Sequence, residues 1–375
     1  MANVPRETLK NKYNVIIIGA GLSGSEAAAV ISRFEIKTLV INISMDNPAY
    51  IKSTNVISDE ENRLIKKINK SEKYLLNNIN KTAILQKKEN GEFKDVYIID
   101  RKRFSLNYKY FLEKQNKIDT RQGLVEEIKI SKNNVYEIKL NDGEEYAADY
   151  VIISCGTFFN GVTIFGDNRI KAGRHGEISS ISLPENLKRS GIRFERKRTY
   201  VPVFIDGKNI NIQKGNISNE FFCLKKSNCE RYVIHTFLKE DNKKKLIIKI
   251  PEFLSNSEKA DINRIFTLFP ESNETKEYNI DNFICMENEP FQEKLINRIK
   301  TLEKVILTKP AYLIEYDGII KNELLSTFES KKLPNLYFPG EINGTKKYIE
   351  IAYQGVLSGA DIINKFYKRL IIKIE

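Results

Sequence analysis

Three glycines near the start of the chain have the spacing that brings a backbone close to phosphate. Gly19, Gly21 and Gly24 follow the apolar run 15–18 and precede an alanine-rich segment. The first permits a tight turn, the second allows close approach to a pyrophosphate, and the third lets a helix pack closely on the strand. The start of that helix presents unpaired N–H groups to the anion, which its dipole also attracts. The pattern predicts a dinucleotide-binding turn; the alternative is a glycine-rich turn that binds nothing.

An acidic residue near the other end of the chain provides a second contact for the same ligand. Gly340 and Glu341 follow the apolar run 336–338 and precede a predicted helix over 349–367. A carboxylate at such a turn accepts hydrogen bonds from ribityl or ribose hydroxyls. A classical NAD site has an acid after its second strand, where this chain has Asn42. Two distant segments that converge on one long ligand therefore favour FAD over NAD.

Side chains suited to nucleophilic or metal chemistry are few. The cysteines and histidines are Cys155, Cys223, Cys229, Cys285, His175 and His235. Because they lack a close metal-ligand spacing, we expect no metal site. So few cysteines fit a reduced, cytoplasmic setting. From the residues alone, the catalytic groups stay unknown.

Hydrophobic patterning predicts an α/β fold around these residues. Strands are expected at 13–18, 37–42 and 150–157, and helices at 22–34 and 58–88. Residues 101–103 are expected to precede a further helix that runs through Tyr110. Alternating apolar and polar residues at 124–130, 135–140 and 145–150 predict an antiparallel meander, with a turn at 141–143.

The middle of the chain differs in character, because short strand-like runs there alternate with polar loops. We expect residues 10–195 plus 301–375 to form a discontinuous, Rossmann-like FAD-binding domain. Residues 196–300 are expected to form an inserted, smaller α/β domain.

Charge and hydropathy limit the kinds of partner. The formal net charge of +12, from 61 Lys and Arg against 49 Asp and Glu, favours a polyanion such as RNA. An even scatter of lysine explains the excess equally well. The sequence has no long uncharged apolar run and no N-terminal apolar leader, so we expect neither a transmembrane helix nor a signal peptide.

Longer strings in the chain resemble a known family, the GidA/MnmG enzymes. This family comprises FAD-dependent tRNA uridine 5-carboxymethylaminomethyl modification enzymes. The matching segments, in order, are 15–28, 47–49, 155–161, 172–177, 180–183, 205–207, 310–317, 338–345 and 348–355.

The resemblance implies a two-dinucleotide-binding-domain flavoprotein and a set of FAD contacts. These contacts are Gly19, Ala20, Gly21, Leu22, Ser23, Gly24, Val125, Ser180 and Glu341. It also implies NADH and methylenetetrahydrofolate as co-substrates, tRNA as substrate, an MnmE-type GTPase partner and a homodimer. Arg174 and Glu177 are candidates for binding substrate or a cofactor phosphate, with a structural ion pair as an equal alternative for Arg174. Lys346 and Lys347 are candidates for a place beside the flavin.

The chain departs from the family's pattern at its reactive residues. Asp46 stands where the family has a cysteine before Asn-Pro-Ala, and the run 50–54 replaces a glycine-rich segment. A second family cysteine near the nicotinamide site has no match between 235 and 251. An aspartate cannot act as a thiolate nucleophile. The chain also ends soon after the last predicted helix, which implies a short form without the family's C-terminal helical domain.

Three functions therefore remain open at this point. The first is flavin-dependent formation of the 5-carboxymethylaminomethyl group on the tRNA wobble uridine. The second is a folate- and FAD-dependent RNA uracil-5 methyltransferase, which should lack the string at 172–177. The third is a degenerate, non-catalytic flavoprotein subunit, which suits Asp46 and the shortened insert.

Overall fold

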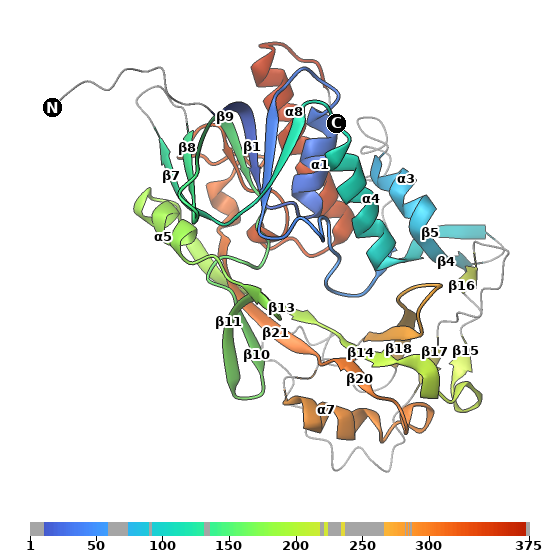
Figure 1. Cartoon of the computed structure of the whole chain (residues 1–375). Helices are drawn as coiled ribbons and strands as arrows, with labels where there is room; N and C mark the ends of the chain where they lie inside the picture. The colour runs from blue at the N-terminus through green and yellow to red at the C-terminus, as the bar shows by residue number, and fades with distance from the viewer. Residues whose placement is uncertain are drawn as a thin grey trace, which may run out of the picture.

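The computed structural model describes most of the chain as two connected bodies of sheets and helices (Figure 1). It describes residues 11–58, 74–89, 92–130, 136–217, 221–223, 234–236, 266–281, 283, 285 and 287–372. The upper body in Figure 1 contains the main sheet and helices α1, α4 and α8, and the lower body contains α7 and the strands around it.

The main sheet is built on buried parallel strands, ordered β6-β2-β1-β9, with β22 also paired to β9. Its strands are β1 (Lys12–Ile18), β2 (Thr38–Asn42), β6 (Ile118–Gln122), β7 (Val125–Ile130), β8 (Tyr136–Leu140), β9 (Glu145–Ile153) and β22 (Leu336–Tyr337). Val15, Ile16 and Ile17 are fully buried. Such a run of apolar residues is typical of a parallel strand that is covered on both faces.

The predicted meander is confirmed, because β7, β8 and β9 pair antiparallel in chain order. The separate strand expected over 150–157 is wrong: β9 runs without a break from Glu145 to Ile153. The same strand pairs antiparallel with β8 and parallel with β1. One long strand can therefore join the meander to the parallel part of the sheet.

Three helices lie against the main sheet, and a fourth packs on β7. They are α1 (Leu22–Ile31), α4 (Arg101–Glu113), α8 (Tyr348–Phe366) and α5 (Ser182–Arg189). Helix α8 approaches α1 closely, because a Cβ at Gly355 would overlap the Ser23 carbonyl. This contact brings the last helix beside the glycine-rich turn, although the two are more than 300 residues apart.

A five-stranded sheet and a six-stranded sheet complete the two bodies. Their orders are β12-β11-β10-β21-β13 and β15-β17-β18-β19-β14-β20. The first contains β10 (Val162–Phe165), β11 (Asn168–Arg174), β12 (Glu177–Ile178), β13 (Phe194–Val201) and β21 (Tyr312–Ile319). The second contains β14 (Val203–Asp206), β15 (Asn216–Ile217), β17 (Ile234–Thr236), β18 (Phe266–Pro270), β19 (Glu277–Asp281) and β20 (Leu307–Lys309), beside α7 (Glu289–Ile296).

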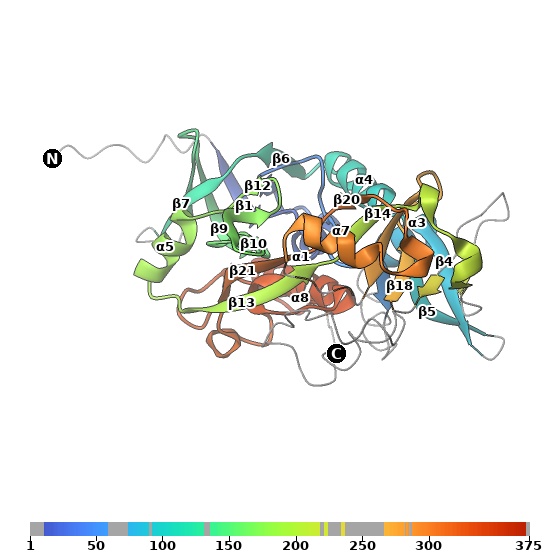
Figure 2. The same ribbon diagram turned by 90° about the horizontal axis from the view of Figure 1, so that it is seen from below.

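Two chain crossings link these sheets, one from β13 to β14 and one from β20 to β21. Strands β13 and β21 pair along their whole length and run side by side toward the α7 layer (Figure 2). The division into domains at residues 196 and 300 stays a prediction.

The helix predicted over 58–88 is partly wrong. Within it, α3 (Tyr74–Thr82) is helical, but residues from Ala83 onward form β4 (Ala83–Glu89), and 59–73 lie outside the described residues. Strand β4 joins β3 (Val56–Ser58), β5 (Glu92–Ile99) and β16 (Phe221–Cys223) in a four-stranded sheet. Ile84 and Leu85 are buried against Ile98 and Phe269, so tertiary packing overrides the helical preference of the polar residues.

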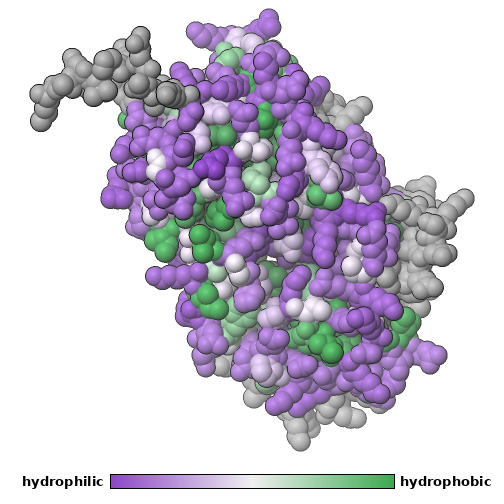
Figure 3. Space-filling model, in the orientation of Figure 1, coloured by the Kyte–Doolittle hydropathy of each residue, from purple (hydrophilic) through white to green (hydrophobic). Residues whose placement is uncertain are grey.

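Short 3₁₀ turns complete the described structure. They are η1 (Gly207–Asn209), η2 (Ile212–Lys214), η4 (Lys300–Leu302), η5 (Lys321–Glu323) and η6 (Glu341–Asn343). The face of the molecule in Figure 3 is mostly hydrophilic, with small separate hydrophobic areas. Among the described residues, no helix combines the length and apolar character needed to cross a bilayer.

Candidate cofactor site

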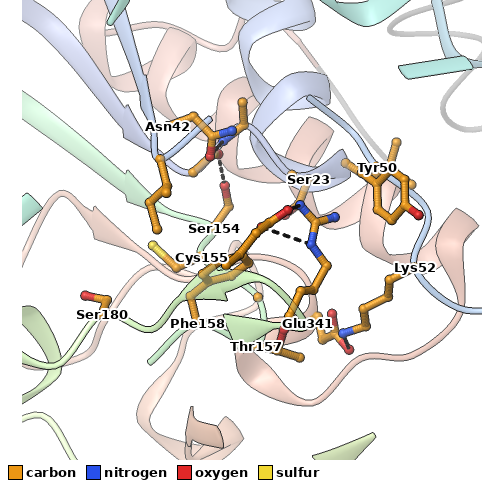
Figure 4. A pocket seen from close by; sticks show the side chains of 18 of the residues that line it. Ser23, Asn42, Tyr50, Lys52, Ser154, Cys155, Thr157, Phe158, Ser180 and Glu341 are labelled. Atoms are coloured by element: carbon orange, nitrogen blue, oxygen red, sulfur yellow. Dashed lines mark hydrogen bonds and ion pairs between the residues drawn. The ribbon is translucent and has the colours of Figure 1, made fainter. Parts of the chain in front are cut away.

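A cavity of about 320 Å³ opens at the carboxyl ends of β1, β2 and β9. This edge of a parallel sheet is where open α/β folds bind ligands. The lining comes from the glycine-rich turn, the loops after β2 and β9, strands β11 and β12, and the segment before α8 (Figure 4).

The glycine-rich turn has the geometry that its sequence predicts. Gly19 has a φ of +97°, and a Cβ there would lie 2.7 Å from the Ser154 carbonyl oxygen. A Cβ at Gly24 would overlap both the Gly19 carbonyl and the Ser154 hydroxyl. Gly21 caps α1 without a side-chain hydrogen bond. The first N–H groups of α1 can therefore face an anion in the cavity.

Most of the predicted contact residues lie around this one cavity. Gly19, Ala20, Gly21, Leu22, Ser23, Val125, Ser180 and Glu341 all line it. Gly24 does not line the cavity. It lies where α1 packs on β1, and its lack of a side chain allows the close approach of the two elements. The Ser180 hydroxyl is buried and has no hydrogen-bond partner among the described residues, which marks a place where a ligand can donate or accept a hydrogen bond.

Asn42 holds the turn in place, a function that the sequence did not reveal. Its side-chain oxygen accepts a hydrogen bond from the Ala20 N–H at 3.1 Å, and its amide nitrogen donates to the Ser44 carbonyl at 2.5 Å. An amide can accept and donate at once, whereas an ionised carboxylate only accepts. Asn42 therefore contributes to the shape of the phosphate turn.

The Gly340–Glu341 turn is fastened to the start of α1. The Ser23 hydroxyl donates to the Pro339 carbonyl at 3.2 Å, and the Gly340 N–H donates to the Gln354 side chain at 2.7 Å. Gly340 has a φ of +90°, and a Cβ there would overlap the Ser23 hydroxyl. These contacts hold Glu341 beside the glycine-rich turn, as the sequence predicts.

Lys52 is a cavity residue that sequence reasoning missed. Its ammonium forms an ion pair with Glu341, and the two side chains are 11% and 17% exposed. Burial lowers the pKa of Lys52, while Glu341 opposes this change. The only sequence signal was its place in the run 50–54, where the family resemblance leads us to expect glycines.

Arg174 and Glu177 both line the cavity, and they pair with each other. The Arg174 guanidinium donates to the Glu177 carboxylate at 2.8 Å and lies 4.4 Å from the centre of the Tyr50 ring. Lys346 lies exposed in the lining, whereas Lys347 precedes α8 and is not in the lining.

The described cysteines are poorly suited to nucleophilic chemistry. Cys155 lines the cavity, but burial raises its pKa to about 12. Cys285 belongs to the core beside α7, and burial raises its pKa to about 11. The Cys223 side chain and Cys229 lie outside the described structure. Neutral thiols are weak nucleophiles.

Asp46, which the family resemblance matches to a cysteine, is outside the cavity lining. Its side chain is 78% exposed and pairs with Lys109 at 2.9 Å. Among the described residues, no three His, Cys, Asp or Glu side chains cluster as metal ligands.

Comparison with known proteins identifies the family. The family profile described as "Glucose inhibited division protein A" matches residues 14–265 and 245–369. The chain belongs to the GidA family. The matched ranges include the glycine-rich turn, Lys52, Ser180 and Glu341, so the whole described cavity lies within GidA-family sequence.

The GidA relatives in the comparison are longer than this chain. The tRNA uridine 5-carboxymethylaminomethyl modification enzyme MnmG of Streptococcus suis is 26% identical over 389 residues, covering 94% of this chain and 61% of its own length. The Bacillus velezensis MnmG is 28% identical over 383 residues, covering 93% and 61%. This chain therefore spans about 61% of the length of these relatives.

Solved structures agree with the fold. Aquifex aeolicus GidA superposes with a TM-score of 0.85 at 24% identity, over 96% of this chain and 65% of that protein. The GidA-related protein from Thermus thermophilus gives a TM-score of 0.51 at 15% identity, over 94% of this chain and 99% of that protein. At such identities the likeness supports the α/β architecture.

Proposed function

We propose that this GidA-family chain binds FAD in the cavity and takes part in forming the 5-carboxymethylaminomethyl group on the wobble uridine of tRNA. The observation that carries the proposal is the convergence of the glycine-rich turn and Glu341 on one cavity, within a chain similar over more than nine-tenths of its length to enzymes named for that modification.

The residues present fit FAD. The uncapped start of α1 suits a pyrophosphate, and Glu341 suits the hydroxyls of a ribityl chain. The buried Ser180 hydroxyl lacks a partner among the described residues and suits a polar group of the ligand. Gly19 and Gly21 line the cavity with backbone alone.

FAD, when bound, would supply the reduction step of the modification. The chain's own residues would hold it: Asn42 by fixing the turn, and Ser23 by fastening the Gly340–Glu341 segment to α1. The Arg174–Glu177 pair over Tyr50 would form a wall of the cavity. NADH and methylenetetrahydrofolate are the co-substrates that the same proposal requires.

The proposal extends to tRNA, an MnmE-type GTPase partner, a homodimer and a cytoplasmic location, all drawn from the family resemblance. The excess of Lys and Arg, which gives a net charge of +12, favours binding of a polyanion such as tRNA.

A flavin-binding subunit without a nucleophile of its own is the second candidate function. Asp46 is exposed and paired with Lys109, and the buried Cys155 thiol is held neutral. Both observations favour a degenerate, non-catalytic flavoprotein subunit, since the family resemblance finds neither of the family's two cysteines at a matching position of this chain.

The test separates these candidates in two steps. The purified chain is examined for flavin absorbance, and wobble uridines are then mapped by mass spectrometry in cells that lack the gene. Loss of the 5-carboxymethylaminomethyl group supports the proposed function. Bound flavin with unchanged RNA supports the subunit, loss of 5-methyluridine indicates the methyltransferase, and absence of flavin overturns the cofactor assignment.

A further inference from the structure

The Lys52–Glu341 ion pair is the feature of the cavity that the glycine-rich motif does not explain. Lys52 belongs to a run in which the family resemblance leads us to expect glycines. Its ammonium is buried, and among the described residues it has no hydrogen-bond partner besides the ion pair with Glu341. A cation therefore lies beside Glu341, the carboxylate that we propose as a contact for the cofactor's hydroxyls.

The pair lies at one end of the cavity. In Figure 4, Asn42 lies on one side, Tyr50, Lys52 and Glu341 lie on the other, and Ser23 lies between them. In a dinucleotide-binding fold the pyrophosphate sits at the start of the first helix, and the adenosine extends toward the end of the second strand. Asn42 ends that strand. The flavin half of a bound FAD would therefore extend toward Lys52.

The charges at this end are balanced in pairs. Lys52 neutralises Glu341, and Arg174 neutralises Glu177. Each of these four side chains is at most 27% exposed, so solvent screens them less than surface charges. Reduction adds electrons to the flavin, and a nearby uncompensated carboxylate would oppose that added negative charge.

We propose that Lys52 neutralises Glu341 and thereby raises the reduction potential of the bound flavin. This inference rests on the proposed binding of FAD in the cavity. Lys52 acts here as a tuning residue: it sets the charge that the flavin meets, which is one of the ways in which a protein adjusts a cofactor's electronic properties. A glycine at this position would leave Glu341 without its cation.

The test uses the whole chain loaded with FAD and measures the flavin's reduction equilibrium against a reference dye. Lys52→Met removes the cation with little change in side-chain length and leaves Glu341 uncompensated. We expect the equilibrium constant for reduction to fall about tenfold, as befits one unit charge near the flavin. Lys52→Met with Glu341→Gln restores a neutral pair, so its constant should return to within about threefold of wild type.

Lys294→Met is the control, because Lys294 is an exposed lysine on α7 that does not line the cavity, and it should leave the equilibrium unchanged. Glu341→Gln alone should shift the constant upward, which keeps the test decisive if Lys52→Met does not fold. An FAD-loaded Lys52→Met variant with the wild-type constant overturns this inference alone. A wild-type chain that takes up no FAD overturns the proposed function and the inference together.

Discussion

At the scale of single residues, the site depends on where a side chain is missing as much as on where one is present. Gly24 lies where α1 crosses β1, and any side chain there would enter the space of the Gly19 carbonyl and the Ser154 hydroxyl. The Ser154 hydroxyl also donates to that carbonyl. The turn is therefore fixed by backbone contacts together with Ser154 and Asn42, which leaves the N–H groups at the start of α1 available to a ligand.

The Gly24→Ala variant should distort this turn. Because the added methyl group meets a carbonyl oxygen in a packed interior, we expect a loss of about 1–3 kcal/mol in unfolding free energy and a marked loss of FAD binding. Denaturant unfolding and flavin titration measure the two effects. Gly143→Ala serves as control, because a Cβ at Gly143 meets no atom within 4 Å and only its positive φ is strained; equal flavin loss in both variants would contradict the argument.

The Ser180→Ala variant should separate ligand binding from stability. The Ser180 hydroxyl is buried without a described partner, so its removal should leave the unfolding free energy of the cofactor-free chain unchanged or higher. Its loss should weaken FAD binding by about tenfold if the ligand satisfies it. Parallel measurements of unfolding and of the flavin dissociation constant test this. A variant that binds FAD like wild type would show that the hydroxyl faces no cofactor group.

At the scale of elements, the pairing of β13 with β21 is supported by a cluster of charged side chains on one face. Asp317 on β21 accepts hydrogen bonds from Asn160 and Arg196 at 2.8 Å each and pairs with Lys188 at 3.0 Å. Burial raises the pKa of Asp317, but these partners outweigh burial and hold it below its ordinary value. The cluster connects the five-stranded sheet to α5.

This lowered pKa predicts a loss of stability in acid. The folded state favours the ionised carboxylate, so its stabilising contribution is complete above the ordinary pKa of about 3.9 and is lost as pH falls toward the lower folded pKa. Asp317→Asn should remove that part of the pH dependence. Unfolding free energies of both proteins between pH 3 and pH 7 measure it; parallel curves for the two proteins would contradict the prediction.

Element types were predictable wherever local pattern and tertiary environment agree. The run 15–18 and the meander follow directly from hydrophobic patterning, and both are present as β1 and β7–β9. Residues 83–88 were not predictable as a strand, because their neighbours in the small core come from β5 and β18. The place of Lys52 in the cavity was not predictable either, since its partner Glu341 lies 289 positions away in the chain (341 − 52).

At the scale of the whole molecule, a buried ion pair joins the two bodies. Arg101 begins α4 and donates to Glu271 through Nε at 2.7 Å and Nη2 at 2.9 Å. Asn279 donates to Glu271 at 2.7 Å and to Asn55 at 2.8 Å. Arg101 is 3% exposed and Glu271 is 6% exposed. The lower body is therefore connected to the cavity-bearing body by a water-excluded polar network.

Replacing both residues of this pair should lower the unfolding free energy by less than the sum of the losses from the two single replacements. Arg101→Met leaves the Glu271 carboxylate buried and unpaired, and removing one partner of a buried pair costs about 3–5 kcal/mol. Arg101→Met with Glu271→Met removes both charges, and the apolar pair should recover much of that loss, because neither side chain then carries an unpaired charge. Denaturant unfolding of the wild type, Arg101→Met, Glu271→Met and the double variant gives the coupling energy. If the double variant is less stable than Arg101→Met alone, the two residues do not act as a unit.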